Sequence, residues 1–188
     1  MTEGQAMVYI LLGEGFEESE ALVPADLLRR GGAEVALVGL EELEVTGGHG
    51  ITVKADITLD QVDEEKMEML VLPGGMGGVE SIQLNLFALA LIQRAYDLGC
   101  WIGAICAAPT ILARIGFLDR RKAVCFPGME EEMGSAVVQL GESVVTDGRI
   151  ITGEAAGSSF EFGLRLVEAV KGRGTAQKVK NSVHFHHG

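Results

Sequence analysis

Apolar residues along this chain follow two alternating patterns: short continuous runs, and longer segments in which they recur every three or four positions. The short runs are typical of buried strands, and the longer segments are typical of amphipathic helices. Strands are predicted at residues 7–12, 35–40, 69–72, 101–105, 123–126, 143–146 and 149–152, and helices at residues 17–30, 79–98, 107–115 and up to about 171. Apolar strands that alternate with helices indicate a mainly parallel sheet with helices on both faces, a doubly wound α/β sandwich.

Turn and cap signals mark the ends of several elements. The first strand, the first helix and the second strand lie within about 35 residues, which is typical of a βαβ unit with parallel strands. A small hairpin or an excursion is expected over residues 44–53, and Asp147-Gly148 is a hairpin signal between the last two strands. Ser158 and Glu161 match a capping box ahead of the last helix. Residues 181–188 are expected to be loosely ordered.

Composition narrows the class of protein. The chain has 188 residues, 47% of them hydrophobic, so we expect a single domain over residues 1–188 with its core at about 7–180. The 27 acidic residues outnumber the 15 lysines and arginines, and the net charge of -12 argues against nucleic acid or a membrane surface as a partner. The sequence shows neither a signal peptide nor the roughly 18 apolar residues of a spanning helix, so we expect a cytoplasmic protein.

Cys106 is the most informative single residue, because it lies between a predicted strand and the start of a helix, with glycine and alanine neighbours. A thiol at a tight strand-to-helix turn stands clear of the sheet, and the peptide dipoles of the helix start favour its thiolate. This layout is a nucleophile elbow, and an inert buried cysteine is the alternative. Three cysteines do not make a disulfide framework, so we expect reduced thiols, and we expect Cys100 and Cys125 to be structural.

Two further loops carry groups capable of chemistry. The glycine-rich turn at residues 72–78 (LPGGMGG) lacks the features of a nucleotide-binding loop, but its N–H groups, with that of Ala107, are suited to hold an oxyanion. A plain tight turn is the alternative. Glu17, Glu18 and Glu20 begin the first helix, where each is either a solvated end or a carboxyl group near Cys106 that moves protons. The pattern does not choose among the three.

Histidines are scarce in the predicted fold. His49 lies on a glycine-flanked loop, whereas His184, His186 and His187 fall in the last five residues. A cysteine hydrolase normally uses an imidazole to take and return a proton, so His49 is a candidate for that role, with a surface loop histidine as the alternative. The terminal histidines are not assigned to a metal site, and no metal site is predicted.

Four motifs stand in order along the chain: residues 15–20 (GFEESE), 71–75 (VLPGG), 104–109 (AICAAP) and 157–162 (GSSFEF). Together they resemble the ThiJ/PfpI superfamily, and within it the branch of the parkinsonism-associated protein DJ-one and bacterial YajL. The resemblance spans about residues 7–180 and implies a flavodoxin-like fold that forms a homodimer. It also implies that Cys106 is the reactive thiol, that Glu20 hydrogen-bonds it, and that the amides of Gly74, Gly75 and Ala107 surround it.

Activities in this family include glutathione-independent conversion of methylglyoxal to lactate, deglycation of early glyoxal adducts, sensing of oxidative stress through cysteine sulfinate, and chaperone activity. Many members place a histidine beside the active cysteine, and this chain has Phe126 at the matching position. The protease-like branch carries a histidine directly after its nucleophile. This chain has Ala107 there, so peptidase activity is not expected.

Two interpretations follow. The first is a cofactor-independent enzyme that acts on small reactive aldehydes, in which Cys106 adds to the aldehyde and Glu20 moves the proton. In this interpretation the amides of Gly75 and Ala107 hold the oxyanion. The second is a thiol redox sensor or redox-regulated chaperone, in which Cys106 is oxidised without efficient turnover. Neither interpretation requires a cofactor.

Overall fold

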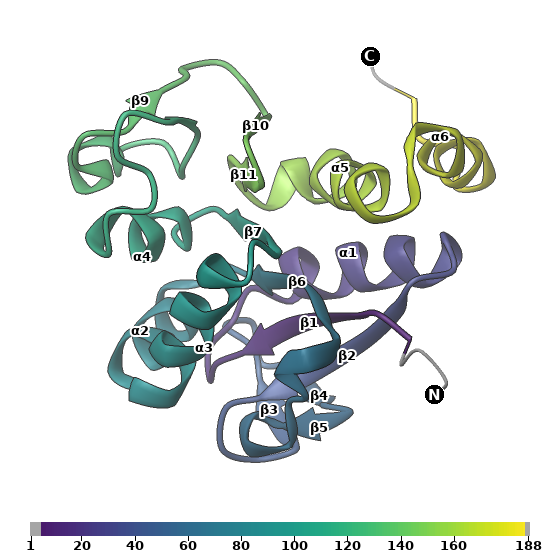
Figure 1. Cartoon of the computed structure of the whole chain (residues 1–188), viewed down its shortest axis with the longest axis horizontal. Coiled ribbons are helices and arrows are strands. Elements are labelled where there is room, and N and C mark those ends of the chain that lie inside the picture. Colours follow the sequence, from purple (N-terminus) through teal and green to yellow (C-terminus); the bar gives the residue numbers. More distant parts are fainter. Residues whose placement is uncertain (1–4, 187–188) are drawn as a thin grey trace.

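The computed structural model describes residues 5–186, and a twisted sheet lies at the centre of the molecule (Figure 1). Within these residues the sheet has seven strands in the order β10-β11-β7-β6-β1-β2-β5. Their bounds are β1 (Met7–Leu12), β2 (Glu34–Gly39), β5 (Ile57–Thr58), β6 (Met67–Leu72), β7 (Trp101–Ile105), β10 (Val144–Asp147) and β11 (Ile150–Gly153). Every neighbouring pair is parallel except β10 with β11. The predicted mainly parallel, doubly wound sheet of flavodoxin-like order is confirmed.

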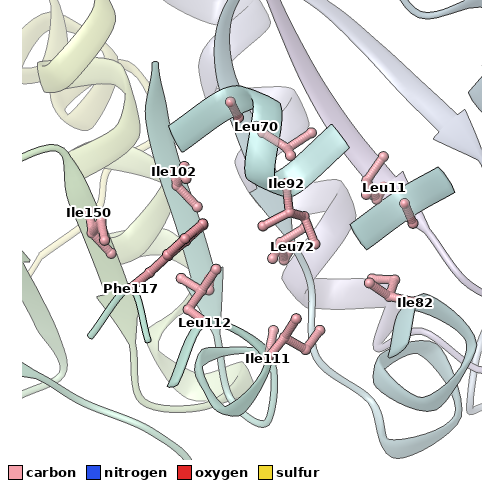
Figure 2. Packing of buried hydrophobic residues seen from close by; sticks show 14 of the residues in the cluster. Leu11, Leu70, Leu72, Ile82, Ile92, Ile102, Ile111, Leu112, Phe117 and Ile150 are labelled. Carbon is pink, nitrogen blue, oxygen red and sulfur yellow. The ribbon is translucent and has the colours of Figure 1, made fainter. Parts of the chain in front are cut away.

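Helices cover both faces of the sheet (Figure 1). One face carries α1 (Glu18–Arg30), α5 (Ser159–Lys171) and α6 (Arg173–Ser182), and the other carries α2 (Met76–Leu84), α3 (Leu86–Asp97) and α4 (Pro109–Arg114). Successive residues of a strand point to opposite faces, so β1 contributes Ile10 to the α1 side and Leu11 to the α3 side. Each side of the sheet has its own hydrophobic core. Figure 2 shows the core on the α3 side, where Leu72 lies close to Ile92.

Smaller elements lie outside the central sheet. They are the antiparallel pair β3 (Glu44–Thr46) and β4 (Thr52–Lys54), the parallel pair β8 (Lys122–Ala123) and β9 (Val137–Val138), and the 3-10 helices η1 (Leu59–Gln61), η2 (Glu64–Lys66), η3 (Glu130–Met133) and η4 (Ala156–Ser158). The hairpin expected over residues 44–53 is therefore confirmed. The late hairpin is also confirmed, although its turn residues are Gly148 and Arg149, one position later than predicted.

Three helical predictions need correction. The predicted helix over residues 79–98 is interrupted at Asn85, because the Asn85 side chain accepts hydrogen bonds from the N–H groups of Phe87 and Ala88 and so caps a new helix. The helix after Cys106 begins at Pro109 instead of Ala107. The capping box before α5 does not form, because the Ser158 side chain makes no cap hydrogen bond.

Two other elements differ from the sequence-based prediction. The strand expected over residues 123–126 ends at Ala123, because the Val124 N–H donates to the Thr152 hydroxyl instead of a neighbouring strand. Helix α6 was missed, and it makes part of the tail ordered: the Phe185 ring stacks on Phe160 with centroids 5.6 Å apart. Met1 and His187 lie outside the described residues. Within residues 5–186, the helices are too short or too polar to cross a membrane.

Candidate active site

Three loops that were predicted to carry chemistry meet at the carboxyl edge of the sheet. They follow β1, β6 and β7, which are neighbours in the order β1-β6-β7. After β1, the chain adds β2 on one side of β1 and later adds β6 on the other side of β1. The strand order therefore reverses between β1 and β6. In open α/β sheets, this point is where ligands bind.

Cys106 lies on a sharp turn directly after β7. Its φ of 66° is in the left-handed region, which costs a non-glycine residue on the order of 1–3 kcal/mol and is held only where the surroundings enforce it. Two backbone hydrogen bonds do so: the Cys106 N–H donates to Gly153 O at 3.0 Å, and the Phe126 N–H donates to Cys106 O at 2.8 Å. The residue is half-buried and packs against both cores, so the turn has the geometry of a nucleophile elbow.

Glu20 is the carboxyl group beside this cysteine. Its side chain is fully buried, and Oε2 accepts a hydrogen bond from the Gly74 N–H at 2.8 Å. Oε1 is buried without a hydrogen-bond partner among residues 5–186, and the Cys106 side chain lies beside the carboxyl group and lowers its pKa. Of the three first-turn glutamates, the structure therefore brings Glu20 to the thiol.

Cys106 and Glu20 compete for one negative charge. Burial raises the pKa of Glu20 to about 7, and the hydrogen bonds from Cys106 and Gly74 offset this only in part. The pKa of Cys106 is raised to about 12, mainly by burial. The negative charge of Glu20 and its hydrogen bond raise it further. A low pKa of the thiol, expected from the sequence, therefore does not hold while Glu20 is ionised. The thiolate is therefore favoured only when Glu20 is neutral, with the proton on its carboxyl group.

The backbone amides around the pair divide into two groups. The N–H groups of Gly75 and Ala107 hydrogen-bond the Cys106 sulfur and lower its pKa, whereas the Gly74 N–H serves Glu20. A Cβ atom at Gly74 would lie 2.5 Å from Glu20 Oε2 and 2.6 Å from Cys106 Cβ, so this position admits only glycine. The glycine-rich turn therefore does more than reverse the chain, because it brings the Gly75 amide to the sulfur and the Gly74 amide to Glu20.

Glu17, Glu18 and His49 form a separate cluster. The His49 ring Nδ1 lies 3.0 Å from Glu18 Oε2 and 3.3 Å from Glu17 Oε2, and its side chain is 70% exposed. In the described part of the chain, its polar contacts are with these two carboxyl groups instead of Cys106. Their ligand atoms lie within 4.8 Å of one another, close enough for a metal ion, but both Glu18 oxygens already accept hydrogen bonds from the His49 loop.

Phe126 and Gly153 complete the surroundings of Cys106. The Phe126 amide contacts the Cys106 carbonyl group, and its side chain is 45% exposed, so the position that resembles the family histidine does lie beside the cysteine. Gly153 was missed at the sequence level. A Cβ atom there would lie 2.9 Å from Ile105, so the glycine that ends β11 allows the close approach that anchors Cys106.

Comparisons with known proteins agree with this geometry. Residues 6–169 match the model of the DJ-1/PfpI family. Protein dj-1beta of Drosophila melanogaster is 33% identical over 172 residues, covering 90% of this chain and 92% of that protein. Deglycase PfpI of Pyrococcus furiosus is 31% identical over 165 residues, covering 87% of this chain and 99% of that protein.

Solved structures give the same result. The crystal structure of Drosophila melanogaster DJ-1beta has a TM-score of 0.90 at 31% identity, covering 97% of this chain and 100% of that chain. A structure titled as oxidized Toxoplasma gondii DJ-1 has a TM-score of 0.91 at 30% identity, with the same coverage. The fold, the four motifs and these matches agree, and the chain belongs to the DJ-1/PfpI family.

Proposed function

We propose that this protein is a cysteine-dependent, cofactor-independent enzyme that acts on small reactive aldehydes and converts methylglyoxal to lactate. The observation that carries the proposal is the Cys106–Glu20 pair, in which a half-buried thiol adjoins a carboxyl group whose pKa is raised to about 7. A group with such a pKa both takes and returns protons at neutral pH. The naming of similar proteins as deglycases supports a carbonyl substrate.

The first step is addition of the thiol to the aldehyde. The Cys106 proton passes to Glu20, the thiolate attacks the aldehyde carbon, and a carbon–sulfur bond forms while the carbonyl π pair moves to oxygen. The N–H groups of Gly75 and Ala107, which face the sulfur, stabilise that oxyanion. Glu20 then returns its proton to the oxyanion, which gives a hemithioacetal and leaves Glu20 ionised.

The second step moves a hydrogen between adjacent carbons. The Glu20 carboxylate removes the proton from the former aldehyde carbon and returns it to the neighbouring carbon through an enediol intermediate. The first carbon is thereby oxidised to a thioester and the second is reduced to an alcohol, so no external oxidant is consumed. Water then cleaves the thioester, which releases lactate and restores the thiol.

The test is lactate formation from methylglyoxal by purified full-length protein. We expect Cys106→Ser to abolish it, because the serine hydroxyl remains protonated in this site. Cys100→Ser is the matched control, because its hydroxyl group can still donate to Met67 O, which the Cys100 thiol contacts at 2.9 Å. Full lactate formation by Cys106→Ser contradicts the proposal.

A second candidate is a redox sensor, and Phe126 is the observation that favours it. Its side chain stands where many family members supply an imidazole, so proton transfer rests on Glu20 alone. In this function, peroxide oxidises the Cys106 thiolate to sulfenate with release of water, and a second peroxide gives sulfinate. The relative solved in an oxidized state supports such chemistry. Intact mass after mild peroxide should show two added oxygen atoms, and an equal gain in Cys106→Ser rules the sensor out.

We also propose a cytoplasmic homodimer. The sequence resemblance supports the dimer, and Cys100, Cys106 and Cys125, which form no disulfide with one another, suit a reducing compartment. Light scattering of purified protein tests the dimer, and a monomer mass at micromolar concentration contradicts it.

A further inference from the structure

A second surface, away from the thiol, has the properties of a docking groove. A cavity of about 660 Å³ lies at the carboxyl edge of the sheet, between the segments that follow β1 and β2 and the junction of α2 with α3. A neighbouring cavity of about 480 Å³ shares part of this lining, including Asn85 and Phe87. The two cavities adjoin each other, because Leu40, Glu41, Asn85 and Phe87 line both, and they are called the groove below.

The apolar wall of the groove is unusually exposed. Leu84, Leu86 and Phe87 are 77%, 78% and 80% exposed, although large apolar side chains are normally withdrawn from water. They stand at a fixed corner, because the Asn85 side chain accepts hydrogen bonds from two backbone N–H groups of α3. The backbone that carries the patch is therefore fixed, which lowers the entropic cost of binding to it.

The opposite wall is acidic. Glu14, Glu41, Glu42 and Glu44 line the larger cavity, and no lysine, arginine or histidine is among its lining residues. All four glutamates are exposed, and none of them forms an ion pair within residues 5–186. A surface with an apolar strip beside unpaired carboxylates is complementary to a segment that is apolar on one side and cationic on the other.

We propose that this groove binds a lysine- or arginine-rich amphipathic segment of a partner protein, with apolar side chains seated on both sides of Phe87. The local charge favours such a cationic partner, because the four glutamates line the larger cavity with no lysine, arginine or histidine beside them. The groove includes neither Cys106 nor Glu20 in its lining, so this inference is independent of the aldehyde chemistry.

The test uses full-length protein and three synthetic peptides of equal length, followed by fluorescence anisotropy. One peptide carries leucines at helical spacing with lysines between them, the second replaces each lysine by glutamate, and the third replaces each leucine by serine. We expect only the first to bind well, at least about tenfold more tightly than the others. Equal binding of the lysine–serine peptide would mean general attraction to an acidic protein, and would overturn the proposal.

Variants locate the binding surface. We expect Leu86→Ser combined with Phe87→Ser to weaken binding about tenfold or more, since exposed apolar anchors carry most of such an interface. Leu140→Ser is the matched control, because Leu140 is 79% exposed but does not line the groove. These side chains are mostly in water, so the substitutions leave the fold intact, which circular dichroism verifies.

A charge variant tests the acidic wall separately. Glu41→Gln, Glu42→Gln and Glu44→Gln together should weaken binding and flatten its dependence on salt. A triple variant outside the groove, with Glu65→Gln, Glu131→Gln and Glu142→Gln, has the same net charge as the groove variant and should bind as the parent does.

Two outcomes overturn the proposal. One is an equal loss of binding in both triple variants. The other is a fall in the mass of the protein assembly in Leu86→Ser/Phe87→Ser, which would show that a second copy covers the groove. Cys106→Ser should bind the peptide unchanged, so failure of the aldehyde chemistry and failure of docking are distinguishable.

Discussion

Glu18 and Glu20 are two positions apart in the first turn of one helix, both are buried, and yet the structure gives them opposite properties. Burial alone would raise the pKa of Glu18, but hydrogen bonds from its own N–H, the His49 ring and the N–H groups of His49 and Ile51 outweigh it and lower the pKa. Glu20 receives one backbone N–H, from Gly74, and burial raises its pKa to about 7.

The difference lies in the number and kind of donors, because desolvation acts on both side chains. Glu18 meets a loop that supplies several N–H groups, so the carboxylate is stabilised and fixes the hairpin of β3 and β4 to α1. Glu20 meets a thiol, a weak donor that itself prefers to be protonated. One carboxyl group therefore serves structure and the other is available for proton transfer.

The largest expected effect comes from Glu20→Gln, which keeps the shape of the side chain and removes its charge and its titration. Lactate formation should fall on the order of 10²- to 10⁴-fold, the usual contribution of a general acid or base. Alkylation of Cys106 by iodoacetamide near pH 8 should become faster, because the pKa of the thiol falls when the neighbouring negative charge is lost.

Glu18→Gln is the control for this experiment, since it changes the neighbouring carboxyl group without touching the thiol. We expect its alkylation rate and its lactate formation to match those of the parent. Slower alkylation of Cys106 in Glu20→Gln would mean that the carboxyl group promotes the thiolate, which contradicts the competition for one charge described above.

The sequence could predict most of the central sheet but only part of the site. Buried strands such as β1 and β7 are continuous apolar runs, and their pattern alone is sufficient. Helix α6 was missed because few of its residues are apolar, and its burial depends on packing against α5. At the site, the helical pattern placed Glu17, Glu18 and Glu20 near the sheet edge but left them equivalent. Only the family resemblance selected Glu20, because long-range contacts with Gly74 and the His49 loop decide the roles.

A second expected effect concerns stability and pH. The native state holds the Glu20 proton up to about pH 7, whereas the unfolded chain releases it near its ordinary pKa of 4.5. The contribution of Glu20 to stability is therefore complete below about pH 4.5 and is lost as the pH rises through about 7. The parent should lose on the order of 3 kcal/mol across this range relative to Glu20→Gln. Urea unfolding at pH 5 and pH 8 measures this, and parallel pH profiles contradict the raised pKa.

Glu18→Ala should have a smaller effect with the opposite dependence on pH. Its removal leaves the N–H groups of His49 and Ile51 without their acceptor, which should cost about 1–3 kcal/mol in the free energy of unfolding at neutral pH. Because the pKa of Glu18 is lowered, this stabilisation is present above the unfolded pKa and is lost as the pH falls through the folded value. Urea unfolding should therefore show the deficit shrinking in acid. Glu65→Ala, at an exposed position, serves as the control and should stay within about 0.5 kcal/mol of the parent.

The smallest expected effect separates His49 from catalysis. The His49 ring pairs with Glu18 and Glu17. The hydrogen bond with Glu18 raises the pKa of His49, and the negative charges of Glu17 and Glu18 raise it further. In Glu18→Gln, proton NMR titration should show that pKa returning toward about 6.5, the value of an unperturbed histidine. His49→Asn should leave lactate formation within about twofold of the parent, because Glu20 already carries the proton between carbons and loss of a catalytic histidine would cost about 10²-fold or more. A fall of that size in His49→Asn, together with a displaced pH profile of the remaining activity, would show that His49 takes part in proton transfer. His49 would then act with Glu20 in the chemistry, and not only with Glu18 in holding the loop.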